Sequence, residues 1–87
     1  GEYINPKVAV SPQEAFYSQK KSVRIMDAVG AVSGEFVMCY PPGIPILAPG
    51  ELITKEIAQY IVYAKEKGCS MQGTEDPEVE YLKVLEQ

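Results

Sequence analysis

The clearest hydrophobic pattern in this chain is the repeat of apolar side chains at spacings of three and four over residues 54–68, the period of a helix with one buried face. Thr54 suits the N-cap of this helix, and Gly68 suits its C-terminal end. The predicted buried face consists of Ile57, Tyr60, Ile61 and Ala64. The pattern therefore predicts one amphipathic helix in the second half of the chain.

A shorter helix is predicted over residues 11–18. The sequence Ser11-Pro12-Gln13-Glu14 is typical of a helix start, because serine can cap, proline fits the first turn and glutamate completes a capping box. Ala15 and Phe16 are the expected buried positions. Packing is the favoured interpretation of Phe16 and Tyr17, with contact to a ligand as the alternative.

Alternating or dense apolar positions predict strands over residues 20–26, 31–40, 69–72 and 79–85, with a tight turn or a single helical turn at residues 27–30. In residues 31–40 the alternation favours one face for the core. That face consists of Val32, Phe36, Met38 and Tyr40. Glu35, on the other face, is either a solvated carboxylate or one that faces a partner.

Residues 40–51 contain four of the seven prolines and two glycines, and only Glu51 is charged. Pro42-Gly43 and Pro49-Gly50 each suit a type II turn, with glycine at the position of positive φ. Because Ile44 and Ala48 each precede a proline, the link between the turns is expected to be extended. The segment is predicted to form a stiff, apolar double bend that borders a site or interface.

The order of these elements predicts an α+β fold: one small domain with a few short strands and two helices around the rigid, proline-rich double bend. All 87 residues are assigned to this domain, with residues 1–10 as an entry segment. We expect the chain to be a piece of a longer protein.

Composition narrows the possible functions. The net charge of -4 argues against nucleic-acid binding, which needs a basic surface. No apolar run has the length of a membrane span. Cys39 and Cys69 have no metal-ligand spacing and are expected to be reduced thiols, as in a cytoplasmic protein. Neither a metal site nor nucleic-acid or membrane partners are therefore expected.

Candidate chemistry within the chain is sparse. There is no histidine, so the usual general base is missing, and no phosphate-binding glycine loop or nucleophile motif is present. Three carboxylates stand in notable positions. Glu51 precedes a helix, which suits either helix electrostatics or a site, and Glu75 with Asp76 suits either a loop turn or a receptor for a guanidinium or ammonium group.

The string from Tyr40-Pro-Pro-Gly-Ile-Pro to Pro49-Gly50-Glu51 resembles the signature of the C-terminal domain of the Orn/Lys/Arg decarboxylases, which are pyridoxal-phosphate-dependent enzymes of fold type I. Residues 15–18 (AFYS), 34–37 (GEFV) and 72–77 (QGTEDP) are similar to the compact arginine decarboxylase branch. The resemblance covers residues 10–85. Cys39 stands where the family pattern often has proline.

The resemblance implies that the chemistry lies elsewhere in a longer chain. A lysine in a Ser-x-His-Lys setting, on a larger domain, would hold pyridoxal 5'-phosphate (PLP), so this chain is expected to contain neither catalytic nor cofactor-binding residues. The domain would cap the active-site entrance and select a basic amino acid through residues of the signature and the acidic loop. The entrance residues it suggests are Tyr40, Glu51, Glu75 and Asp76.

The favoured function is thus the C-terminal domain of an arginine decarboxylase, which forms agmatine and carbon dioxide in polyamine biosynthesis. Its expected partners are the N-terminal and PLP-binding domains of the same chain and further copies in a homo-oligomer. Lysine or ornithine as substrate is the first alternative. A free-standing interaction module, whose proline segment binds an aromatic groove, is the second and explains less of the pattern.

Overall fold

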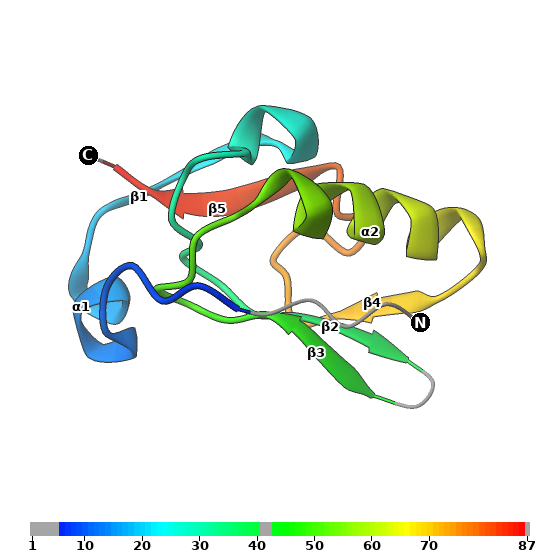
Figure 1. Cartoon of the computed structure of the whole chain (residues 1–87), viewed down its shortest axis with the longest axis horizontal. Helices are drawn as coiled ribbons and strands as arrows, with labels where there is room; N and C mark the ends of the chain where they lie inside the picture. Colours follow the sequence, from blue (N-terminus) through cyan, green and yellow to red (C-terminus); the bar gives the residue numbers. More distant parts are fainter. Residues whose placement is uncertain (1–5, 41–42, 87) are drawn as a thin grey trace.

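The computed structural model describes residues 6–40 and 43–86, which form two small sheets and two α-helices (Figure 1). The elements are α1 (Pro12–Tyr17), β1 (Lys20–Arg24), the 3₁₀ helix η1 (Ile25–Ala28), β2 (Val37–Tyr40), β3 (Ile44–Leu47), α2 (Lys55–Glu66), β4 (Ser70–Gln72) and β5 (Tyr81–Leu85). The predicted α+β class is confirmed. Neither α-helix in this part of the chain has the length and apolar character needed to cross a membrane.

Both α-helices begin where the sequence places their caps. The Ser11 hydroxyl accepts the Glu14 N–H at 3.0 Å, and the Thr54 hydroxyl accepts the Ile57 N–H at 3.1 Å. Helix α2 ends before Gly68, whose φ of 90° favours glycine. The buried residues of α2 are Ile57, Ala58, Ile61 and Ala64. The predicted helix and three of its four predicted face residues are therefore confirmed as buried, while Tyr60 is half-buried.

Strands β1 and β5 form an antiparallel pair that runs from Lys20 opposite Leu85 to Arg24 opposite Tyr81. The 3₁₀ helix η1 follows β1 directly and contacts α2. In Figure 1, β5 and β1 lie on one side of the molecule, and β2, β3 and β4 lie on the other. Residues from near both ends of the chain thus form one of its two sheets.

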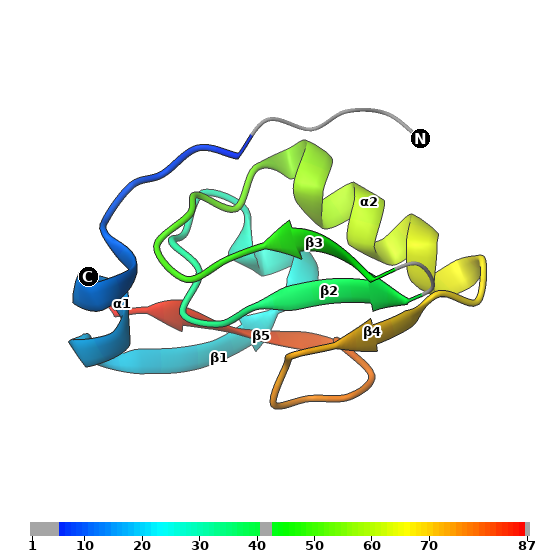
Figure 2. The same cartoon turned by 90° about the horizontal axis from the view of Figure 1, so that it is seen from below.

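The second sheet has the order β3-β2-β4, and β2 pairs antiparallel with both neighbours (Figure 2). The extended link predicted between the two Pro-Gly turns is β3. Pro45 is tolerated there because β3 is an edge strand, where a residue without an N–H group removes no bond from the sheet interior. Since β3 pairs with β2 and Leu47 is buried, this segment is part of the sheet and is not a free ligand for an aromatic groove.

The core lies between α2 and the inner faces of the two sheets. Its fully buried large side chains include Leu47 from β3, Ile57 and Ile61 from α2, and Leu82 and Val84 from β5. Each contributes about 1.5–3 kcal/mol by leaving water. The helix and both sheets therefore depend on one shared core.

The predicted strand over residues 31–40 was wrong in its length, and of the four residues of its predicted buried face only Val32 is buried. Only Val37–Tyr40 form β2, because Val32 and Ser33 instead bridge Leu52 and Val84. Within β2, Val37 and Cys39 are buried, whereas Tyr40 and the preceding Phe36 are 43% and 51% exposed. Both faces of this strand are apolar, so alternation alone did not identify the one that packs against α2.

Phe16 was also predicted to be buried, and this was wrong. Helix α1 is only six residues long and buries Ala15 alone. Phe16 and Tyr17 are 72% and 75% exposed, and their rings pack edge to face on each other with centroids 5.1 Å apart. Such a short helix has room for one inward position, which the smaller residue occupies.

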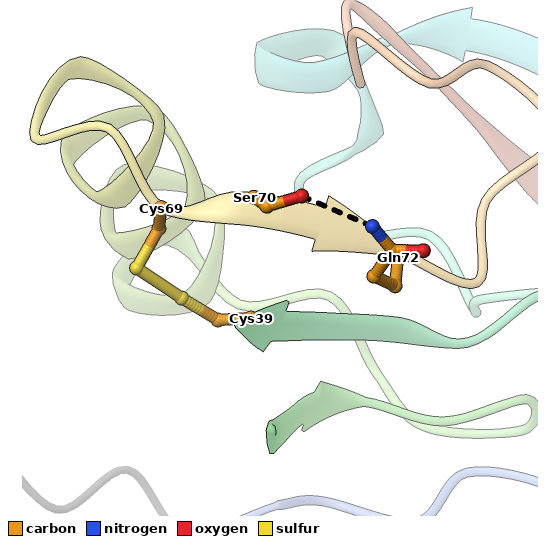
Figure 3. The surroundings of a disulfide bond; sticks show 4 residues. All are labelled: Cys39, Cys69, Ser70 and Gln72. Carbon is orange, nitrogen blue, oxygen red and sulfur yellow. Dashed lines mark hydrogen bonds between the residues drawn. A yellow bond between two sulfur atoms is a disulfide. The ribbon is translucent and has the colours of Figure 1, made fainter. Parts of the chain in front are cut away.

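The expectation of two reduced thiols was wrong as well, because Cys39 and Cys69 form a disulfide (Figure 3). Their Cα atoms are 5.9 Å apart, within the usual range for such a bond. Pairing of β2 with β4, with Cys39 opposite Met71, brings the two residues together. The bond joins β2 to the residue before β4, just after α2.

Replacing Cys39 with serine is expected to lower the free energy of unfolding by about 3 kcal/mol, because the disulfide restricts the unfolded chain. Urea unfolding of the 87-residue chain, with and without dithiothreitol, measures this loss. Cys69→Ser is the matched control and should cost the same, and the reductant should not affect either variant further. A wild-type midpoint that the reductant leaves unchanged would contradict the prediction.

Candidate functional site

The turn at Pro49-Gly50 fixes the end of β3. The Glu51 N–H donates to the Ala48 carbonyl at 3.1 Å, and Gly50 has a φ of 92°, so the predicted type II turn is confirmed. A Cβ at Gly50 would overlap with the carbonyl oxygen of Val10. Glycine is therefore required here both by the backbone angle and by the close approach of the N-terminal segment.

The side chain of Glu51 also stabilises this turn. Its Oε1 accepts the Ala48 N–H at 2.9 Å, while its own N–H donates to the Ala48 carbonyl. The two residues thus hold each other through two hydrogen bonds. Glu51 also lines a small hollow of about 150 Å³, together with Pro6, Pro45, Ile46, Leu47 and Ala48. The carboxylate stabilises the turn and stands at the edge of an apolar depression.

Tyr40 lies at the opposite end of the β2–β3 hairpin. Its ring lies beside Gly43, whose φ of 83° is also in the glycine-favoured region. The predicted turn at Pro42-Gly43 lies partly outside the described residues. Tyr40 is 43% exposed, so it offers an aromatic surface near the tip of the hairpin, away from Glu51.

Asp76 organises the loop that joins β4 to β5. Its carboxylate accepts the backbone N–H groups of Glu78 at 3.1 Å, Glu80 at 3.0 Å and Tyr81 at 3.1 Å. The Thr74 hydroxyl donates to the Asp76 carbonyl at 2.7 Å. The loop is therefore wrapped around one carboxylate, as the turn interpretation of this residue predicts.

These amides change the acidity of Asp76. The Glu78 N–H lowers the pKa of the carboxyl group most. Desolvation, the second-largest effect, raises the pKa, and the Tyr81 and Glu80 N–H groups and the charge of Lys65 lower it further, so that the net pKa shift is downward. Asp76 is accordingly held as an anion that the loop backbone solvates.

Val79 in the same loop has a φ of 51°, a backbone angle that is rare for a β-branched residue. Its side chain is fully buried in the core, and its N–H donates to the Asp76 carbonyl at 3.0 Å. Core packing and the bonds to Asp76 together hold this strained conformation.

Glu35, whose role the sequence left open, is neither simply solvated nor free to face a partner. Its Oε1 accepts the Glu75 N–H at 3.0 Å, and its Oε2 accepts the Lys83 N–H at 2.8 Å. Lys83 Nζ in turn lies 3.2 Å from Glu75 Oε1. One carboxylate therefore ties the start of β2 to the acidic loop and to β5. That Glu35 is the sole charge in residues 31–40 was the sequence signal for a special role.

The four predicted entrance residues occupy three separate places. Tyr40 lies at the hairpin tip, Glu51 at the other end of β3, and Glu75 and Asp76 in the β4–β5 loop (Figure 2). The larger hollow, of about 330 Å³, is lined by none of them. It is formed by Lys65, Cys69, Ser70, Met71, Gln72, Pro77 and Glu78. Within residues 6–40 and 43–86, no three metal-ligating side chains are grouped.

Comparison with known proteins assigns this arrangement to a family. The family described as "Orn/Lys/Arg decarboxylase, C-terminal domain" matches residues 2–79. The arginine decarboxylase of Bacillus anthracis is 43% identical over 82 residues, which cover 94% of this chain and 17% of that protein. The lysine decarboxylase of Hafnia alvei is 36% identical over 79 residues, covering 83% of this chain and 11% of that protein.

Comparison with solved structures supports the same family. The structure of the constitutive lysine decarboxylase of E. coli superposes with a TM-score of 0.76 at 27% identity, covering 93% of this chain and 14% of that one. The chain thus spans about a sixth of the length of the curated arginine decarboxylases that it matches.

Glu35→Gln is expected to destabilise the chain by about 2 kcal/mol, because an amide NH₂ would replace one of the two oxygens that accept backbone N–H groups. Amide hydrogen exchange should accelerate at Glu75 and Lys83. Glu86→Gln, at an exposed position, is the control and should change neither quantity. Unaltered exchange at both amides in Glu35→Gln would contradict the assigned role.

Asp76 should make stability depend on acid pH. Because its pKa is lower in the folded state, its contribution is fully present above about pH 4, the ordinary value in the unfolded chain, and is lost as the pH falls through the lower folded value. Urea midpoints of wild type and Asp76→Asn should differ above that pH and converge below it. A difference that persists undiminished at low pH would show that the charge of Asp76 is not what stabilises the loop.

Proposed function

This chain belongs to the family of Orn/Lys/Arg decarboxylase C-terminal domains, and on that premise we propose that it caps the active-site entrance of a PLP-dependent arginine decarboxylase. The proposed enzyme converts L-arginine to agmatine and carbon dioxide in polyamine biosynthesis. The observation that carries the proposal is the family match over residues 2–79, which includes the signature hairpin. Arginine is favoured as substrate because identity is higher to the arginine decarboxylases than to the lysine decarboxylases.

The described part of the hairpin suits a cap because local contacts hold both of its strands in place. Gly50 and Glu51 lock one end of β3, and the disulfide at Cys39 holds β2 close to the hairpin tip. A wall that is already ordered loses little entropy when a ligand or a neighbouring domain meets it. The proposed role of the hairpin is to keep the rim of the entrance in place.

The four entrance residues differ in whether their side chains are exposed or are already engaged in hydrogen bonds to the backbone. Tyr40 has an exposed ring, and the Glu75 side chain is 75% exposed beside Lys83. The carboxylates of Glu51 and Asp76 already accept backbone hydrogen bonds. We therefore assign attraction of the substrate guanidinium to Glu75, apolar contact to Tyr40, and support of the rim to Glu51 and Asp76.

PLP itself does not fit the described part of this chain. A lysine that holds this cofactor needs an environment that lowers its pKa, such as an apolar pocket. Every lysine here is exposed or half-buried, and two of the half-buried ones already contact Phe16, Ser18 or Glu75 through Nζ. In the proposal, PLP is held by the rest of the full-length chain, where it accepts the electrons left when carbon dioxide departs.

The proposal also includes a homo-oligomeric enzyme in the cytoplasm. One observation weighs against that location: the Cys39–Cys69 disulfide, because persistent disulfides are rare in that compartment. Cell fractionation followed by detection of the full-length protein decides the location, and sedimentation of the same protein decides the oligomeric state.

The full-length enzyme, loaded with PLP, is expected to release carbon dioxide from arginine at least about tenfold more efficiently, in kcat/KM, than from lysine or ornithine. The 87-residue chain alone should release none. Glu75→Gln should raise KM for arginine several-fold with little change in kcat, while Glu86→Gln should leave both unchanged. Preference for lysine or ornithine would replace the proposed substrate, and activity of the 87-residue chain alone would overturn the capping role.

A further inference from the structure

The two halves of the Cys39–Cys69 disulfide differ in their access to solvent. Cys39 is 3% exposed and belongs to the core, whereas Cys69 is half-buried and packs against the edge of that core. Cys69 also lines the hollow of about 330 Å³ that lies beside the end of α2 and β4. A reagent in solution therefore approaches the bond from the Cys69 side, while the core shields Cys39.

The hollow has room for a small thiol. A water molecule takes up about 30 Å³ in the liquid, so the space corresponds to several water molecules. Four of the side chains that line it beside Cys69 are polar: Lys65, Ser70, Gln72 and Glu78. Such a lining is wetted readily, and a dissolved thiol can reach Cys69 Sγ through it.

Thiol–disulfide exchange at Cys69 needs a thiolate and the bond itself. The attacking thiolate forms a new S–S bond to Cys69 Sγ, the bond to Cys39 breaks, and Cys39 leaves as a thiolate that takes up a proton. A second thiolate of the same dithiol reductant then displaces Cys69 from the mixed disulfide. The two cysteines gain two electrons and two protons, and the dithiol becomes a disulfide. The same steps in reverse restore the bond.

The disulfide fastens the tip of the signature hairpin to another part of the domain. The Cys39 carbonyl accepts the Gly43 N–H at 2.9 Å, and the next residue is Tyr40, the last of β2. The sulfur of Cys39 is joined to the segment between α2 and β4 (Figure 3). Because β4 has only three residues, its ladder to β2 is short. Loss of the disulfide is therefore expected to loosen Tyr40 and the hairpin tip, whereas hydrogen bonds of Glu51 still hold the other end of β3.

We propose that Cys69 is the point of attack for a dithiol reductant and that the Cys39–Cys69 bond is a redox switch of the enzyme's entrance. The oxidised form holds Tyr40 in place and binds arginine more tightly, and the reduced form binds it more weakly. The effect on arginine rests on the proposed function. Disulfides in the cytoplasm are usually transient or redox-sensing, so a bond that a dithiol can reach agrees with the proposed location.

A monothiol, which stops at the mixed disulfide, tests where exchange begins. Oxidised full-length protein is treated briefly with 2-mercaptoethanol and quenched with acid, and its free thiols are alkylated. Trypsin cleaves after Arg24 and Lys67 and so places Cys39 and Cys69 on different peptides for mass spectrometry. We expect the adduct about tenfold more often on Cys69 than on Cys39, and in similar amounts on both after unfolding in urea. Equal adducts in the native protein, or none on Cys69, would overturn the proposal.

Arginine kinetics of the full-length, PLP-loaded enzyme test the consequence. The enzyme is equilibrated with reduced or oxidised dithiothreitol, which is then removed under nitrogen. The reduced enzyme should have a several-fold higher KM with little change in kcat, because the switch acts on binding and not on the chemical step. Cys39→Ser and Cys69→Ser should both show the higher KM and no response to redox state, which excludes other cysteines of the longer chain. A KM that ignores redox state in the wild type, or that still responds in both variants, would overturn the switch.

The substrate assays separate this inference from the proposed function. An active arginine decarboxylase whose KM is the same in both redox states would overturn the switch and leave the proposed function standing. In an enzyme that prefers lysine or ornithine, the same redox-dependent change in KM for that amino acid would support the switch while the proposed substrate fails.

Discussion

The backbone of Gly50 is where three parts of the chain meet, and the arrangement of the fold depends on this contact. Its N–H donates to the Ser33 carbonyl at 2.8 Å, and its carbonyl accepts the N–H groups of Ala9 and Val10. The residue is buried, and any side chain would collide with Val10. By joining the N-terminal segment to the end of β3, Gly50 sets the direction in which the chain continues into α2.

Three carboxylates accept hydrogen bonds from backbone N–H groups and so hold the turns and loops of the domain in place. Glu35, Glu51 and Asp76 together accept six backbone N–H bonds from their own turns or from distant segments. Two of the six donors, Tyr81 and Lys83, belong to β5, the other four lie in turns or loops, and the negative charge of the acceptor strengthens each bond. Three of the twelve acidic residues therefore serve as internal braces. Glu75 is not one of these braces: Glu35 holds its backbone N–H, and its exposed carboxylate lies 3.2 Å from Lys83 Nζ.

The sheet that carries the signature hairpin is packed against the core on one of its two faces only. An apolar strand such as β2 is stable with one face against α2, yet its other face gains nothing from water. In the family to which this chain belongs, most of the polypeptide lies outside the domain. The locked end of β3 and the exposed side chains of β2 belong to the same hairpin, which is the part of the domain that the proposed capping role uses.

Sequence alone determined the features that depend on neighbours a few positions away. The caps at Ser11 and Thr54, the turn at Gly50 and three of the four residues on the predicted face of α2 were correctly predicted, because capping, turn and helix-face interactions span four residues or fewer. The family was also correctly predicted, from short sequence motifs. Only the tertiary structure decided which face of β2 is buried, the Cys39–Cys69 disulfide and the role of Glu35. The partners of Glu35 lie 40 and 48 positions away, and the two cysteines are 30 apart. Such contacts exist only after the sheets have assembled, so a local pattern can mark Glu35 as unusual but cannot identify its partners.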